Sequence, residues 1–161
     1  TFGKGISNGL PLSILCGQKK FMDVLEWDSP VFVSTTFGGE TLSLAACLAT
    51  ITEMQEKKTI ERCWATGKRF REGLATIGLE TQGYDCRPLL AMKNDPVWKT
   101  KFLEQLFLRG VMLHIGGLVN FCYAHTNDDI DYALNAIDDT MKIIDKVELQ
   151  GTVAVPAFKR L

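Results

Sequence analysis

Residues 40–65 contain neither glycine nor proline, and this uninterrupted run limits the folds open to the chain more than any other feature. Its apolar side chains recur at the spacing of one helical face: Leu44, Leu48, Ile51 and Met54. A second apolar stripe begins at Ile60, after three consecutive charged residues at positions 56–58. The sequence therefore predicts two consecutive helices, or one bent helix, over residues 41–77.

Strands and further helices are predicted on either side of this run. Alternating or β-branched apolar residues favour strands at residues 10–16, 31–34, 89–92 and 118–124. Asp95 followed by Pro96 is typical of a helix start, so we expect a helix over residues 96–109. Thr126 with Asp129 three residues later predicts a capping box, which opens a helix through Ile144. The tail from residue 149 has an irregular pattern.

Charge and cysteine content limit the class of protein. With 18 Lys and Arg against 19 Asp and Glu, the chain has no excess positive charge for nucleic acid or an anionic membrane. No apolar run approaches the roughly 20 residues of a membrane span, and no charged-then-apolar leader opens the sequence. Five widely spaced cysteines do not form a disulfide pattern, and we expect a reducing cytoplasm. Only two histidines and no C-x-x-C pair are present, so no structural metal site is expected.

Two segments have residues suited to chemistry. Lys4 lies between Gly3 and Gly5, where it is either an ordinary exposed lysine or an amine that reaches into a cavity. Residues 35–41 precede the long helix, where hydroxyls and free N–H groups form either an anion site or a simple helix cap by Thr36 or Thr41. A cofactor with both an aldehyde and a phosphate needs one amine and one phosphate cradle.

Four blocks of the sequence resemble the class III aminotransferases, which are pyridoxal phosphate enzymes, and most of all their glutamate-1-semialdehyde aminomutase branch. The blocks occur in family order at residues 1–13 (TFGKGISNGLPLS), 34–40 (STTFGGE), 44–46 (LAA) and 123–131 (YAHTNDDID). The resemblance implies the α/β fold of pyridoxal-phosphate-dependent transferases, fold type I. It assigns residues 1–57 to the end of the large cofactor domain, residues 58–148 to the small C-terminal α+β domain and residues 149–161 to a tail.

The same resemblance implies roles for two residues. Lys4 corresponds to the lysine that forms a Schiff base with pyridoxal phosphate and then moves protons during catalysis. Thr36 corresponds to the threonine that binds the cofactor phosphate, characteristically the one held in the neighbouring subunit. A homodimer with active sites at its interface is therefore expected, acting on a small amino or carbonyl substrate.

The chain also departs from the family pattern. In much of the family, the threonine is followed by an aromatic residue or leucine and then by Ser-Gly-Asn-Pro. In this chain the corresponding residues 38–41 are Gly-Gly-Glu-Thr. Glu40 either faces the substrate or favours the helix dipole. Arg87 is either a surface residue or a group that reaches the site, His125 is expected to fix a corner before a helix, and His114 to pack or line the site rim. Residues 114–120 lack the late arginine by which some relatives hold a substrate carboxylate, which argues against an ω-amino-acid or ornithine-type substrate.

Only three residues precede Lys4, whereas the family's ring-binding aspartate, stacking aromatic and phosphate loop all lie far before the lysine. We therefore expect a C-terminal portion of an enzyme, inactive alone, with apolar side chains exposed where other parts would cover them. Three functions stay open: an aminotransferase, which the departure at residues 38–40 favours; an aminomutase that moves an amino group within one substrate; and a non-catalytic relic or interaction module.

Overall fold

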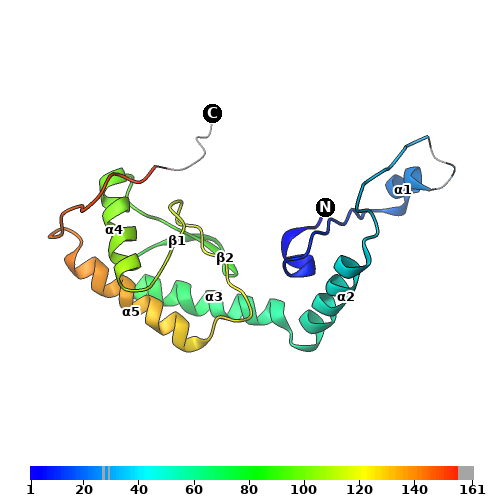
Figure 1. Cartoon of the computed structure of the whole chain (residues 1–161). Helices are drawn as coiled ribbons and strands as arrows, with labels where there is room; N and C mark the ends of the chain where they lie inside the picture. The colour runs from blue at the N-terminus through cyan, green and yellow to red at the C-terminus, as the bar shows by residue number, and fades with distance from the viewer. Residues whose placement is uncertain (27, 29, 156–161) are drawn as a thin grey trace. The chain divides into compact units, whose positions relative to one another are not determined.

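The computed structural model describes residues 1–26, 28 and 30–155. The chain divides into two compact units, Thr1–Lys58 and Thr59–Leu161. Figure 1 shows their elements coloured in chain order. Among the described residues, none of the helices is long and apolar enough to cross a membrane.

The first unit is built on one long helix and short turns. It contains η1 (Lys4–Ser7), α1 (Lys19–Met22), η2 (Asp23–Leu25) and α2 (Thr41–Glu56). The short helix η1 packs against α2. The buried side chains of these two helices are all small: Ser7, Ser43 and Cys47. Small side chains let η1 lie close to α2, so the position of the Lys4 segment is fixed by this helix.

Two expected strands of the first unit are wrong. Residues 31–34 form no regular structure, and the segment 10–16 contributes only one bridge, between Ile14 and Phe2. Alternation does survive in part, since residues 10, 12 and 14 are half-buried while residues 11, 13 and 15 are exposed. A strand requires a neighbour to pair its N–H and C=O groups, and no second strand lies beside these segments among the described residues of this unit.

The two consecutive helices predicted over residues 41–77 are confirmed as α2 and α3 (Thr59–Thr76). The N–H of Lys57 donates to the Glu53 carbonyl at 3.0 Å, and Lys58 then takes a φ of 49°. This left-handed residue ends α2, because a helix cannot continue through it.

The second unit packs helices on a hairpin. Strands β1 (Thr81–Tyr84) and β2 (Arg87–Leu90) pair antiparallel, with Thr81 opposite Leu90. Helices α3 and α4 (Pro96–Leu108) both contact α5 (Asn127–Ile143). The core consists mainly of large apolar side chains from these elements: Phe70, Leu74, Leu90, Trp98, Phe102, Leu106, Ile130 and Ile137.

Both predicted helix starts are confirmed. The Asp95 carboxylate accepts the N–H groups of Val97 and Trp98 at 2.9 and 3.2 Å, with Pro96 at the first helical position. Thr126 and Asp129 form the predicted reciprocal capping box at the start of α5. These starts follow from short-range hydrogen bonds, which a local sequence pattern encodes directly.

The strand predicted at residues 89–92 is confirmed as β2, displaced by two residues, whereas β1 was not predicted. The strand predicted at residues 118–124 is wrong, because only Leu118 forms a bridge, to Leu89. Residues 117–121 still run antiparallel to β2, and the Val119 N–H donates to the Pro88 carbonyl at 3.0 Å. Residues 149–155 are irregular as expected, and the rest of the predicted tail lies outside the described residues.

Candidate active site

Lys4 lies on a short loop that is closed by its own backbone. The Phe2 N–H donates to the Ile14 carbonyl at 2.8 Å, and the Ile14 N–H donates to the Phe2 carbonyl at 2.9 Å. Within the loop, the hydroxyl of Ser7, which is 1% exposed, donates to the Leu10 carbonyl. Sequence analysis did not single out Ser7, since a small polar residue gives no sign that it will be buried. The loop is thus held at both ends and in its middle, while Lys4 itself is exposed.

The backbone of Lys4 is in the left-handed region, with a φ of 54°. For a residue with a Cβ, this conformation costs about 1–2 kcal/mol. Such conformations persist only where the surroundings impose them, and they are concentrated at functional sites. A Cβ on the following Gly5 would meet nothing within 4 Å, so the space beside this part of the loop is open.

The two segments with suitable chemistry share one groove. This open groove has a volume of about 960 Å³ and is lined by Lys4, Gly5, residues 8–13 and residues 35–39. It lies wholly within the first unit. The structure therefore brings an exposed amine and the threonine-rich loop to the same cavity.

The loop at residues 35–39 is a tight turn in which the backbone requires glycine at position 39 and favours it at position 38. The Gly38 N–H donates to the Thr35 carbonyl at 3.4 Å. A Cβ on Gly38 would overlap the Thr35 hydroxyl, and Gly39 has a φ of 76°. Thr36 lies in this turn, and its hydroxyl makes no hydrogen bond to other described residues. The Gly-Gly departure from the family pattern therefore has a conformational cause.

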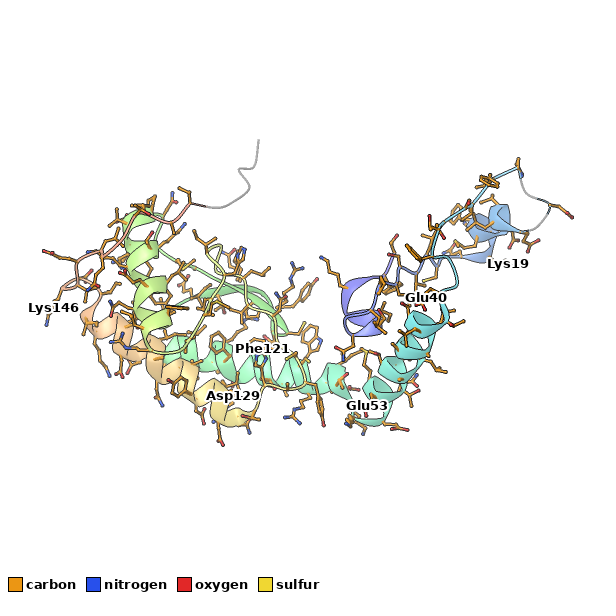
Figure 2. All side chains as sticks on the ribbon, in the orientation of Figure 1. Lys19, Glu40, Glu53, Phe121, Asp129 and Lys146 are labelled. Carbon is orange, nitrogen blue, oxygen red and sulfur yellow. The ribbon has the colours of Figure 1, made fainter. Side chains whose placement is uncertain are left out.

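Glu40 is the N-cap of α2 (Figure 2). Its carboxylate accepts the N–H groups of Leu42 and Ser43 at 2.8 and 2.7 Å. The Ser43 side chain beside it, although its hydroxyl makes no hydrogen bond, and then the N–H groups of Ser43 and Leu42 hold the pKa of Glu40 below its usual value. The alternative that Thr36 or Thr41 caps the helix is wrong, and two of the N–H groups expected to be free at its start are occupied by Glu40. Of the two roles considered for Glu40, the structure supports that at the helix end.

The remaining candidates hold local structure in the second unit. His125 accepts the Cys122 N–H through Nδ1 at 3.1 Å, which confirms that it fixes the turn before α5. His114 accepts the Gly116 N–H through Nδ1 at 3.0 Å and so holds its own turn. Arg87 is an exposed residue of β2. Within the described part of the chain, no group of three or more His, Cys, Asp and Glu side chains is arranged to hold a metal ion.

The fold is that of part of a pyridoxal-phosphate-dependent transferase. A solved structure of FumI from Sphingopyxis sp. MTA144, in its pyridoxal phosphate internal aldimine form, superposes with a TM-score of 0.74 at 26% identity, covering 91% of this chain and 37% of FumI. This match confirms the predicted fold class.

The chain belongs to the class III aminotransferase family, whose sequence profile matches residues 1–144. It is 25% identical over 158 residues to 3-aminobutyryl-CoA aminotransferase of Cloacimonas acidaminovorans, covering 91% of this chain and 38% of that protein. It is 28% identical over 160 residues to glutamate-1-semialdehyde 2,1-aminomutase of Desulfitobacterium hafniense, covering 87% of this chain and 37% of that protein. The chain thus spans less than two fifths of the length of these relatives.

Proposed function

We propose that this chain supplies part of the active site of a pyridoxal-phosphate-dependent aminotransferase, with Lys4 as the amine that binds the cofactor aldehyde and Thr36 as a phosphate ligand. The observation that carries this proposal is the groove that exposes both the Lys4 amine and the turn at residues 35–39, so that Lys4 would serve the cofactor of its own subunit and Thr36 the phosphate held by the neighbouring subunit. Family membership supports it, because class III aminotransferases use pyridoxal phosphate.

The residues of the groove fit this cofactor in two respects. An exposed primary amine on a fixed loop suits covalent attachment of an aldehyde, and an unengaged hydroxyl in a turn suits a phosphate oxygen. The α2 N-terminus has fewer N–H groups to offer, because Glu40 already accepts those of Leu42 and Ser43. Phosphate binding would therefore depend mainly on Thr36 and its turn.

When bound, pyridoxal phosphate supplies the electron sink for bond cleavage at the substrate α-carbon. The role of Lys4 is to hold the cofactor covalently until substrate arrives. Its Nζ would also be the group that moves a proton from the substrate α-carbon during this chemistry. The loop hydrogen bonds between Phe2 and Ile14 keep the backbone of Lys4 fixed during this transfer.

We infer a homodimer in which Thr36 binds the phosphate held by the neighbouring subunit. Large apolar side chains are exposed on the first unit, among them Phe32 at 89%, Phe37 at 78% and Leu48 at 69%. Exposure on this scale is expected where another protein surface normally covers a unit. On this proposal residues 1–57 are the end of the large cofactor domain, residues 58–148 form the small domain, and residues 149–161 are a tail.

The substrate is inferred to be a small amino compound that donates its nitrogen to a carbonyl compound. An aminomutase is a second candidate, supported by the 28% identity to an aminomutase over 160 residues. The two differ in whether nitrogen leaves the substrate. Repeated turnover of one amino-aldehyde without any keto acid, and without nitrogen exchange, would contradict the aminotransferase.

We infer a cytoplasmic location. All five cysteines carry free thiols, and two of them, Cys16 and Cys122, are exposed. Exposed free thiols suit a reducing compartment.

The assignment of Lys4 is tested by reduction with borohydride in the purified protein of natural length, incubated with pyridoxal phosphate. We expect a phosphopyridoxyl group on the peptide that contains Lys4, and its loss in Lys4→Ala. Lys58→Ala is the matched control, because Lys58 is also exposed and also left-handed at a φ of 49°. Undiminished labelling of Lys4→Ala at another lysine would refute the assignment.

A further inference from the structure

Three cysteines from separate segments gather in the second unit. Cys63 lies on α3, Cys86 lies in the turn between β1 and β2, and Cys122 lies in the loop before α5. The Phe121 N–H donates to the Cys86 carbonyl at 3.3 Å, so the last two segments are adjacent. The sequence gives no hint of this cluster, because the three cysteines lie far apart along the chain.

Helix α3 meets both segments one turn after Cys63. A Cβ built on Gly67 would overlap the Asp85 carbonyl and lie 2.9 Å from the Phe121 ring. Phe121 also packs edge-on against Phe70 of α3, with ring centroids 5.4 Å apart, and Figure 2 labels it beside this helix. The face of α3 that carries Cys63 is therefore the face that contacts the other two cysteine segments.

The environments of two of the thiols differ. Burial raises the pKa of Cys63, and the nearby Cys122 and Cys86 thiols raise it further, against a smaller opposite effect of Arg62. Cys63 thus favours the protonated thiol. Cys122, in contrast, is exposed to solvent.

A base lies beside the exposed thiol. The Cys122 sulfur is 3.6 Å from Nδ1 of His125, and this nitrogen also accepts the Cys122 N–H at 3.1 Å. That N–H bond makes Nδ1 the acceptor nitrogen, which leaves the proton of the neutral ring on Nε2. An exposed thiol 3.6 Å from an imidazole nitrogen is placed to pass its proton to that nitrogen in exchange for the N–H bond.

We propose that Cys122 is a peroxide-reactive thiol, that His125 accepts its proton, and that Cys63 is the partner that closes a disulfide with it. This site is separate from the Lys4 groove and does not depend on the proposed aminotransferase function.

The chemistry takes place in two balanced steps with a hydroperoxide as the oxidant. The Cys122 sulfur attacks one peroxide oxygen, the O–O bond breaks, and the leaving oxygen takes the proton held by His125, which gives an alcohol or water. Cys122 is then a sulfenic acid, oxidised by two electrons, and the peroxide is reduced. The Cys63 sulfur attacks the Cys122 sulfur, the S–S bond forms, and the S–O bond breaks to release water with the Cys63 proton.

The test treats the purified full chain with a small excess of hydrogen peroxide in the presence of dimedone, and then maps its peptides by mass spectrometry. We expect a Cys63–Cys122 linked peptide in the parent protein. Cys63→Ser should instead accumulate the dimedone adduct on Cys122, and Cys122→Ser should give neither product. Cys16→Ser is the control, since Cys16 is an exposed thiol of the other unit, and it should behave as the parent.

The role of His125 is tested with His125→Asn, whose side-chain oxygen can still accept the Cys122 N–H and so preserve the turn. We expect the oxidation rate of Cys122 to fall at least about tenfold, as is typical when a positioned base is removed. Three results would overturn the proposal: an unchanged rate in His125→Asn, equal oxidation rates for Cys16 and Cys122, or a disulfide from Cys122 to Cys86 in place of Cys63. Far-ultraviolet circular dichroism of each variant checks that it has folded.

Discussion

Replacing Gly67 by alanine should destabilise the protein, although the position lies inside a helix. In an exposed helix, alanine is about 1 kcal/mol more favourable than glycine, so helix propensity alone predicts stabilisation. Here a Cβ would overlap the Asp85 carbonyl, which belongs to the backbone and cannot rotate away. The same Cβ would lie 2.9 Å from the Phe121 ring, whereas carbon atoms normally approach to about 3.5 Å.

The structure sets the size of this effect. The Phe121 ring would have to move about 0.6 Å, and the hairpin that carries Asp85 would have to move further. Inserting a methyl group into a well-packed contact costs about 1–3 kcal/mol, with rigid backbone neighbours at the upper end. After subtracting the gain in helix propensity, we expect Gly67→Ala to lose about 2 kcal/mol of unfolding free energy.

Urea unfolding of the full chain, followed by circular dichroism at a helical wavelength, measures the change. Gly73→Ala is the matched control on the same helix, because its Cβ would meet the Leu134 side chain, including Cγ at 3.1 Å, and a side chain gives way more easily than backbone. We expect this control to lie within about 1 kcal/mol of the parent. If Gly67→Ala is as stable as the parent or more stable, the close contact between α3 and the hairpin is refuted.

Two further predictions concern helix starts. Asp95→Ala removes the acceptor of two N–H groups at the start of α4 and should cost about 1 kcal/mol in urea unfolding, whereas Asp95→Asn should retain most of the stability. Hydrogen bonds from the Thr126 N–H and hydroxyl lower the pKa of Asp129 in the folded protein. The ionised carboxylate therefore stabilises the fold at pH values above its unfolded pKa, and this stabilisation is lost as the pH falls through its folded pKa. Acid titration below about pH 4 should therefore show a shallower loss of stability in Asp129→Asn than in the parent; parallel curves would contradict this linkage.

Helices were predictable from the sequence because their signals are short-range. The start of α4 at Pro96 and the capping box of Thr126 and Asp129 each depend on residues within one turn. Strands were not predictable from the sequence, because a strand forms only where a second segment pairs with its backbone. Residues 31–34 have the composition of a strand but form no regular structure, whereas β1, with a glycine at its third position, becomes a strand because β2 pairs with it.

The candidate site was predictable in identity but not in arrangement. Lys4 and Thr36 were singled out from their neighbours in sequence and from the family resemblance, and the structure adds that both line one groove. The sequence could not show that Lys4 is left-handed, since this follows from the closure of its loop by Phe2 and Ile14. Contacts between residues far apart in the sequence decide both the shared groove and the conformation of Lys4, as they do the cysteine cluster.

The capping role of Glu40 bears directly on how an anion could be held beside Thr36. A carboxylate next to a phosphate is unfavourable unless its charge is offset. Here the N–H groups of Leu42 and Ser43, together with the positive end of the α2 dipole, offset that charge. A threonine at the cap would have needed its own hydroxyl for the helix, so capping by Glu40 leaves the Thr36 hydroxyl available to the groove. The Gly-Gly-Glu departure thus preserves the function expected of Thr36 while it changes how the helix begins.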